Sequence, residues 1–337
     1  MRILFIKLSS MGDIVHALAS ITDAVEHASS LEIDWVIDTN FQDIAKLHPH
    51  IQKIILTDHR HWRKKPFTSI PAISRFIKQL RLKKYDLILD GQTNWKSALI
   101  SLLARGKRVG LDKRSCREYI AHFAYQIKHT VSRNQHAVEH LREFFSLALG
   151  YPKPKSPPNF SIHIPKEKNP LPLELPNRYY ACIHAASWKT KLWPAEFFAR
   201  LIQKIPHQVV LFWGSEKEKK RAEWIAEKTK NALVLPKLSL IAIAKILSKA
   251  EGVVSVDTGL GQLAGALNRP LVGIHGPTDP KKVGSIGKNV AHIHSSLSCF
   301  PCHKQRCLFQ GRSHKKPACL EQISPETVWK LLQNISI

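Results

Sequence analysis

One stretch near the C-terminal end constrains the fold more than any other part of the chain. Residues 252–256 (GVVSV) form a short apolar run rich in β-branched side chains, which is typical of a buried parallel strand. A break at residues 257–261 (DTGLG) precedes a helical segment, 262–267, and a second apolar run, 271–274. Free N–H groups at such a helix start attract anions, and glycines let the backbone approach a phosphate. An ordinary strand-helix turn with a structural glycine would look the same.

The N-terminus repeats this unit. Residues 2–8 predict a strand, and apolar residues at helical spacing follow a turn that holds a single glycine, Gly12. The turn is therefore neither a G-x-G-x-x-G motif nor a phosphate-binding P-loop. Asp13 stands where the turn meets the helix, so it either caps the helix or acts as a base at the carboxyl end of the strand.

Strand and helix patterns alternate in two halves of the chain. This predicts an α/β protein with two facing, doubly wound, Rossmann-like domains and a ligand cleft between them. A proline-rich stretch, 151–176, holds eight of the 20 prolines and contains the boundary. The expected parts are an N-terminal domain at 1–160, a linker at 161–177, a C-terminal domain at 178–322 and a final helix at 323–337. A final helix of this kind can pack back on the N-terminal domain.

The chain is strongly basic. Its 51 Lys and Arg against 26 Asp and Glu give a formal charge of +25, which favours a polyanionic partner such as a phosphorylated substrate, an anionic membrane or nucleic acid. No apolar run is long enough to span a bilayer, and Lys7 interrupts the only signal-like start, so we expect a cytoplasmic protein. The pattern lacks the recognisable reading helix or aromatic pair of a nucleic-acid-binding module.

Two local motifs permit more than one interpretation. The cluster 59–65 (HRHWRKK) is either a solvated loop or a clamp for phosphates and carboxylates. Residues 136–140 (HAVEH) match a short zinc-peptidase pattern, which is weak in a chain with 18 histidines. We expect these histidines to lie at the surface or to contact substrate.

Four cysteines near the C-terminus follow the spacing C-x2-C-x4-C-x11-C. They are Cys299, Cys302, Cys307 and Cys319. Thiolates at this spacing could hold zinc, although the nearby aromatic residues could equally pack in a metal-free loop.

Taken in order, several of these motifs resemble the ADP-heptose-dependent lipopolysaccharide heptosyltransferases of glycosyltransferase family 9. The matching segments are residues 7–13 (KLSSMGD), 58–65, 135–139 (QHAVE), 254–260 (VSVDTGL) and 276–280 (GPTDP). The resemblance covers nearly the whole chain and implies the two-domain fold called GT-B. It is nearest to enzymes that add the first heptose to the Kdo–lipid A core, with enzymes that use another acceptor, such as the second-heptose site, as the alternative.

The resemblance implies a role for each matching residue. Asp13 would be the general base, and Lys191 would offset charge on the departing ADP. Residues implied to bind the donor are Ala186, Ser187, Glu218, Leu238, Asp257, Thr258, Gly259, Leu260 and Gln262. Residues implied to bind the acceptor are Ser10, Gly12, Arg60, Arg63, Lys64, Arg117 and His136.

Two features depart from the family pattern. Gln262 stands where the family usually has His, and the cysteine-rich tail is more like that of enzymes that add the second heptose. The resemblance further implies inversion at the anomeric carbon, no metal or other cofactor, and work at the cytoplasmic face of the inner membrane. The expected partners are ADP-heptose, the Kdo–lipid A acceptor and the anionic membrane surface, without nucleic acid.

Overall fold

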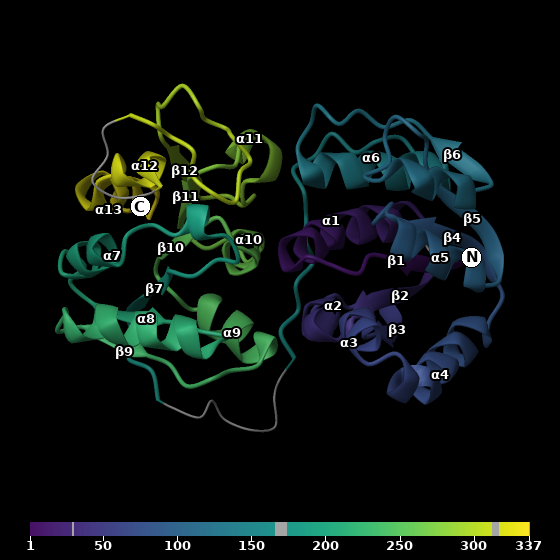
Figure 1. Cartoon of the computed structure of the whole chain (residues 1–337), viewed down its shortest axis with the longest axis horizontal. Coiled ribbons are helices and arrows are strands. Elements are labelled where there is room, and N and C mark those ends of the chain that lie inside the picture. The colour runs from purple at the N-terminus through teal and green to yellow at the C-terminus, as the bar shows by residue number, and fades with distance from the viewer. Residues whose placement is uncertain (29, 166–173, 312–316, 337) are drawn as a thin grey trace. The chain divides into compact units, whose positions relative to one another are not determined.

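The chain divides into two compact units, Met1–His163 and Ile164–Ile337. A computed structural model describes residues 1–28, 30–165, 174–311 and 317–336. The boundary between the two units, after His163, falls inside the proline-rich stretch 151–176. Residues 166–173 of the expected linker lie outside the described residues. Figure 1 shows that each unit holds a sheet flanked by helices.

The N-terminal unit is built on a parallel six-stranded sheet in the order β3-β2-β1-β4-β5-β6. Its strands are β1 (Arg2–Ile6), β2 (Glu32–Asp38), β3 (Ile51–Thr57), β4 (Tyr85–Asp90), β5 (Gly106–Leu111) and β6 (Ile127–His129). Its helices are α1 (Met11–His27), α2 (Gln42–Ala45), α3 (His59–Lys64), α4 (Ile70–Arg81), α5 (Trp95–Leu103) and α6 (Ala137–Leu149), with 3-10 turns η1 (Thr39–Phe41), η2 (Phe67–Ser69) and η3 (Tyr119–Ala124). The central strand β1 is apolar and buried from its second residue on, as expected for a strand covered on both faces.

The C-terminal unit repeats the architecture in the order β12-β11-β10-β7-β8-β9. Its strands are β7 (Tyr179–Ile183), β8 (Gln208–Leu211), β9 (Ala232–Val234), β10 (Val253–Val256), β11 (Leu271–His275) and β12 (Val290–His294). Its helices are α7 (Ala195–Ile202), α8 (Glu216–Glu227), α9 (Leu240–Leu247), α10 (Gly259–Ala266), α11 (Pro280–Val283), α12 (Ala318–Glu321) and α13 (Pro325–Ile335), with the 3-10 turn η4 (Lys189–Lys191). In both sheets the order reverses beside the first strand of the unit, so both are doubly wound, as the sequence predicted.

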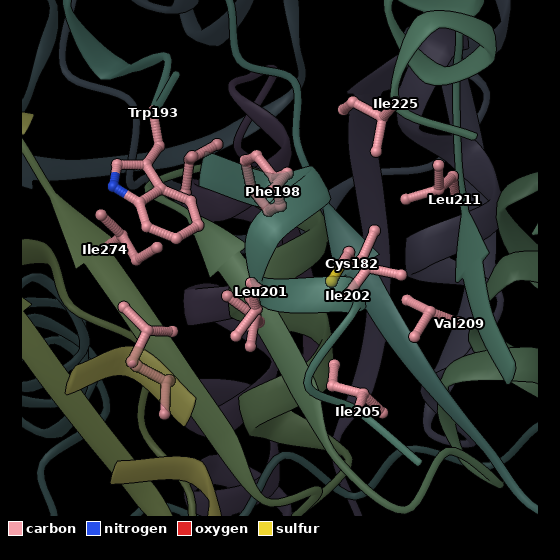
Figure 2. Packing of buried hydrophobic residues seen from close by; sticks show 14 of the residues in the cluster. Cys182, Trp193, Phe198, Leu201, Ile202, Ile205, Val209, Leu211, Ile225 and Ile274 are labelled. Carbon is pink, nitrogen blue, oxygen red and sulfur yellow. The ribbon is translucent and has the colours of Figure 1, made fainter. Parts of the chain in front are cut away.

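Aromatic and aliphatic side chains from α7 and its neighbours fill the core of the C-terminal unit, as Figure 2 shows. Trp193 is fully buried, and its indole N–H donates to the carbonyl of Ile323 at 3.0 Å. The final helix α13 packs against α7 and the sheet, and Val328 and Leu332 belong to this core. Part of the apolar face of the final helix is therefore buried within the C-terminal unit, and its packing on the N-terminal domain stays a prediction.

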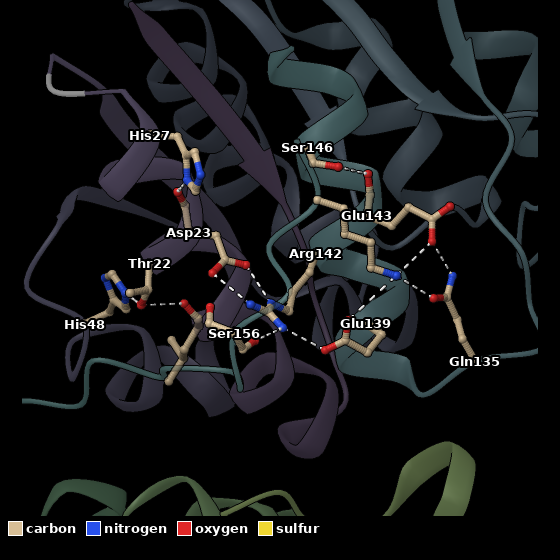
Figure 3. A network of polar contacts seen from close by, with 12 residues as sticks. Thr22, Asp23, His27, His48, Gln135, Glu139, Arg142, Glu143, Ser146 and Ser156 are labelled. Carbon is tan, nitrogen blue, oxygen red and sulfur yellow. Dashed lines mark hydrogen bonds and ion pairs between the residues drawn. The ribbon is translucent and has the colours of Figure 1, made fainter. Parts of the chain in front are cut away.

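A buried ion pair joins α1 to α6 in the N-terminal unit, as Figure 3 shows. The Arg142 guanidinium is 1% exposed and binds both carboxylate oxygens of Asp23, at 2.7 and 3.2 Å. It also donates to Glu139 at 2.8 Å and to the carbonyl of Ser156 at 3.0 Å. The pair fixes the position of α6, whose N-cap is His136.

Some elements differ from the sequence-based expectation. The basic cluster forms a short helix, α3, because the Asp58 side chain accepts a hydrogen bond from the backbone N–H of His61 at its start. Strands β5, β6 and β12 were not predicted, since their Gly, Lys and His residues interrupt the apolar pattern. Among the helices that the structure describes, none is both long and apolar enough to cross a bilayer.

Replacing Arg142 with Ala should destabilise the protein by about 3–5 kcal/mol, because the Asp23 carboxylate would remain buried without its partner. Thermal and denaturant unfolding would measure the loss. The double variant R142M/D23L should recover part of it, since no unpaired charge remains. A single variant as stable as the wild type would contradict this account.

Candidate functional site

The carboxyl ends of parallel strands meet along one edge of each sheet, where ligands of doubly wound folds bind. In the N-terminal unit, β1 leads into Ser10 and Asp13, and β4 ends at Asp90. The edge strand β3, which β2 separates from β1, leads into α3, and β5, next to β4, leads into the turn that holds Arg117. The expected base and the expected acceptor-binding cations therefore follow strands of the same edge.

Asp13 occupies the first turn of α1 and forms a capping interaction. Its Oδ2 atom accepts hydrogen bonds from the backbone N–H and the hydroxyl of Ser10, both at 2.8 Å. Both bonds end on one oxygen, so the cap does not require the second. The capping role predicted from sequence is thus present, and it leaves a carboxylate of fixed orientation at the strand end.

Lys7, to which the sequence analysis assigned no role in the site, is the charged group that acts most strongly on Asp13. Lys7 is 7% exposed and donates from Nζ to the carbonyl of Gly91 at 2.9 Å. Burial opposes ionisation of Asp13, but the Lys7 charge and the Ser10 hydrogen bonds outweigh it, so the pKa of Asp13 is lowered. A lysine inside an apolar strand was the signal that could have identified it.

The loop after β4 holds this turn in place. The side-chain carbonyl of Gln92 accepts from the backbone N–H of Leu8 at 3.0 Å and of Ser9 at 3.2 Å. Buried Asp90 accepts from the N–H groups of Gln92 and Thr93 and from the Tyr125 hydroxyl. The turn before Asp13 is therefore hydrogen-bonded to the turn after β4, which the Asp90 carboxylate stabilises in its place.

The other acceptor-binding candidates fall into two groups. Arg117 follows β5. Burial lowers the pKa of Lys7, and the charge of Arg117 lowers it further, so Arg117 lies within electrostatic range of Lys7. His136 caps α6, and its ring contacts His16 of α1 with centroids 5.6 Å apart. Arg63 and Lys64 lie with Arg60 on α3, where the Arg60 Nε is 3.9 Å from the buried carboxylate of Asp38.

In the C-terminal unit the donor-binding candidates follow adjacent strands in an ordered row. Leu238 follows β9, Glu218 follows β8, the loop with Ala186, Ser187 and Lys191 follows β7, and Asp257 follows β10. These strands are neighbours in the sheet in that same order. The row therefore runs along a single edge.

Lys191 and Asp257 form a close ion pair within this row. The Lys191 Nζ lies 2.7 Å from Oδ2 of Asp257, and the hydroxyl of Thr278 donates to the same oxygen at 2.6 Å. Burial would raise the pKa of the Asp257 carboxyl, but Lys191, His275 and Thr278 more than compensate and lower it. Asp257 is thus ionised at neutral pH and orients the lysine.

Buried His275 and partly buried His292 form a hydrogen-bonded pair near Asp257. The Ser285 carbonyl can only accept, so His292 donates to it from Nε2 at 3.0 Å, and its Nδ1 then accepts from Nε2 of His275 at 3.0 Å. Burial lowers the pKa of His275 to about 4, so the pair is neutral at pH 7. Sequence reasoning missed this pair, since histidine gives no periodic signal in a strand.

Helix α10 begins directly after Asp257. Thr258 is its N-cap but makes no side-chain capping bond, so the first N–H groups of the helix have no partner within it. A Cβ atom at Gly261 would lie 2.6 Å from the Ser255 hydroxyl, so glycine is needed for α10 to approach β10. The Gln262 amide donates to the carbonyl of Val283 at 2.8 Å and is buried.

Glu218 also forms a helix cap. Its Oε2 atom accepts from the backbone N–H groups of Gly214 at 2.8 Å and Ser215 at 3.0 Å, at the start of α8. Glu218 therefore stabilises the start of α8 as an acid in its first turn. Its contact with a ribose stays a prediction. Leu238 is partly exposed, one residue before the cap of α9.

The four clustered cysteines line one cavity of about 340 Å³. All four are free thiols, and burial, followed by the neighbouring thiols, raises the pKa of Cys319 to about 11. Across the described ranges, which leave out residues 312–316, no three His, Cys, Asp or Glu side chains converge to hold a metal ion. The cysteine loop instead supports η4, because the Thr190 hydroxyl donates to the carbonyl of Lys304 at 2.8 Å.

Comparison with known proteins shows that this doubly wound chain is a glycosyltransferase. Residues 73–312 match the family described as glycosyltransferase family 9 (heptosyltransferase), and the chain belongs to this family. Lipopolysaccharide heptosyltransferase 1 of Pseudomonas aeruginosa is 35% identical and covers 97% of this chain and 96% of its own length. The Escherichia coli K12 protein of the same name is 38% identical, over 86% of this chain and 92% of its own. The solved E. coli heptosyltransferase WaaC with ADP has a TM-score of 0.85 at 33% identity, covering 99% of this chain and all of that one.

Replacing Lys7 with Met should raise the pKa of the Asp13 carboxyl, because the nearest positive charge is removed while the apolar stem is kept. Carbon-13 titration of aspartate carboxyls would measure this. The exposed Lys113, replaced in the same way, is the matched control and should leave the Asp13 titration unchanged. An Asp13 signal that titrates at the wild-type pH in the Lys7 variant would show that Lys7 does not tune it.

Proposed function

We propose that the chain transfers L-glycero-D-manno-heptose from ADP-heptose to the Kdo–lipid A core, as a heptosyltransferase I. The observation that carries the proposal is the row of donor-binding candidates along the edge of the C-terminal sheet. The name heptosyltransferase 1 of the two relatives supports the choice of acceptor. Their matches extend over at least 86% of this chain.

The order of the row matches the order of groups in an ADP-sugar. Leu238 at β9 would contact adenine, and Glu218 at β8 would accept from ribose hydroxyls. The diphosphate would lie between Lys191, the 186–187 backbone and the N–H groups of Thr258, Gly259 and Leu260. Asp257 at β10 would then face the heptose, with Gln262 behind it.

Asp13 acts as general base in this proposal. It takes the proton from the acceptor hydroxyl as that oxygen attacks the anomeric carbon of heptose. The new C–O bond forms on the face opposite the bond to ADP, which breaks, so the configuration inverts. The departing diphosphate takes the electron pair, and Lys191 and the start of α10 stabilise its charge without a metal ion or other cofactor.

The acceptor in this proposal is an anionic saccharide on a lipid. Its negative charge is complementary to the cations at the carboxyl edge of the sheet in the N-terminal unit. Arg60, Arg63 and Lys64 on α3, with Arg117 and His136, would bind its carboxylates and phosphates around Ser10 and Gly12. Such an acceptor places the enzyme at the cytoplasmic face of the inner membrane, where anionic lipid attracts its net positive charge.

Mass spectrometry of the product tests this function directly. ADP-heptose and Kdo–lipid A, with and without a first heptose already attached, would be incubated with the wild-type protein. We expect one heptose to be added to the acceptor that lacks it. Addition only to the acceptor that already carries one would assign the second-heptose activity, and no release of ADP with either would reject the proposal.

Replacing Asp13 with Asn should reduce turnover by roughly 10²–10⁴-fold, because the amide can still cap α1 but cannot take a proton. ADP affinity, measured by calorimetry, should stay close to that of the wild type. The matched control is Asp43→Asn, which alters a first-turn acid of α2. Near wild-type turnover in the Asp13 variant would leave that residue only its capping role.

Replacing Lys191 with Met should weaken ADP binding by about tenfold or more, since a charge-assisted contact to phosphate is worth about 1.5–3 kcal/mol. The same change at the exposed Lys189, on the same 3-10 turn, should have little effect. Calorimetry with ADP would measure both. Equal losses in the two variants would indicate only a general electrostatic effect of the turn.

A further inference from the structure

An exposed apolar surface lies on the N-terminal unit and has no role so far. Helix α5 presents Trp95, Leu99 and Leu102 at a spacing of about one turn, and Leu99 is 50% exposed. The opposite face of α5, with Ser97, Ile100 and Ser101, is buried.

The 3-10 turn η3 extends this surface. It packs against α5 and presents Tyr119, Ile120 and Phe123, of which Phe123 is 68% exposed. The backbone N–H of Trp95 donates to Glu118, the residue directly before η3, at 3.0 Å. We call these six side chains the α5–η3 patch. Contiguous exposed apolar surface of this kind marks a protein or membrane interface.

The charge around the patch favours an anionic partner. Residues 94–124 hold seven Lys and Arg against two acids. Both acids accept hydrogen bonds from backbone N–H groups, Asp112 from Arg114 and Ser115, and Glu118 from Trp95. Exposed aromatic and aliphatic side chains in a segment rich in Lys and Arg have the composition of an interfacial membrane anchor.

The patch is also linked to the Asp13 turn. Three residues before Trp95, the Gln92 side chain accepts from the N–H groups of Leu8 and Ser9. Arg117, close to η3 in sequence, donates from its backbone N–H to the Thr93 hydroxyl. The residues directly before α5 and η3 are therefore hydrogen-bonded to each other and to the turn that leads to Asp13, at the carboxyl edge of the sheet.

We propose that the α5–η3 patch docks the N-terminal unit on an anionic lipid bilayer. The aromatic and leucine side chains enter the boundary between headgroups and acyl chains, and the flanking cations bind lipid phosphates. A lipid-linked acceptor can then present its sugar to the Asp13 edge while its acyl chains stay in the bilayer. The inference deepens the proposed function, because it names the surface that brings the enzyme to its acceptor.

The test compares the double variant L99Q/L102Q with the control L147Q/L308Q, which changes two exposed leucines outside the patch. Flotation with vesicles of phosphatidylglycerol and phosphatidylcholine measures binding, and vesicles of phosphatidylcholine alone measure the part of binding that does not depend on lipid charge. We expect the patch variant to lose about tenfold in partitioning into anionic vesicles, and the control to match the wild type. Thermal unfolding verifies the fold, and Ile120→Gln provides an independent variant on η3.

Transfer assays separate this inference from the proposed function. The patch variant should keep wild-type turnover on an acceptor stripped of its acyl chains and lose it on the acceptor embedded in vesicles. Equal flotation of all variants, or absence of wild-type flotation, would overturn the docking role. So would light scattering that shows a wild-type dimer lost in the patch variant, which would assign the patch to a second copy. Wild-type flotation without any heptose transfer would reject the proposed function alone.

Discussion

The parallel arrangement of both sheets is the constraint on which the sites depend. All carboxyl ends of a parallel sheet lie at one edge, so residues far apart in sequence come together there without long-range contacts of their own. In this way Asp13, Arg117 and the cations of α3 lie at the carboxyl edge of the sheet in the N-terminal unit. Lys191 and Asp257 lie at the carboxyl edge of the sheet in the C-terminal unit. The strand order then fixes the order in which a bound molecule encounters them.

Two acids implied to act on substrates are also helix caps. Asp13 accepts from Ser10, and Glu218 from Gly214 and Ser215. A cap holds its carboxylate by backbone N–H groups, which fixes its direction at the strand end. Capping and substrate binding therefore do not compete, since the hydrogen bonds that stabilise the helix end on one oxygen of each carboxylate.

The sequence predicted the two doubly wound units and most central strands, because long apolar runs and turn signals are local. It did not predict β5, β6 or β12, whose polar residues hide the strand pattern. It placed Lys191 and Asp257 in the same site only through family resemblance. Lys7 and the His275–His292 pair were missed, since a buried cation or histidine acquires its role from neighbours that only the fold supplies.

The contact between Lys191 and Asp257 has a consequence for inhibitors. The Lys191 ammonium is already paired with the Asp257 carboxylate, so an incoming phosphate must compete with that carboxylate for the lysine. An uncharged phosphate mimic would gain no charge–charge attraction to Lys191. A compound that presents a cation to Asp257 beside an anion for Lys191 would match both charges at once. Zwitterionic scaffolds are therefore a better starting point for this ion pair than neutral nucleoside analogues.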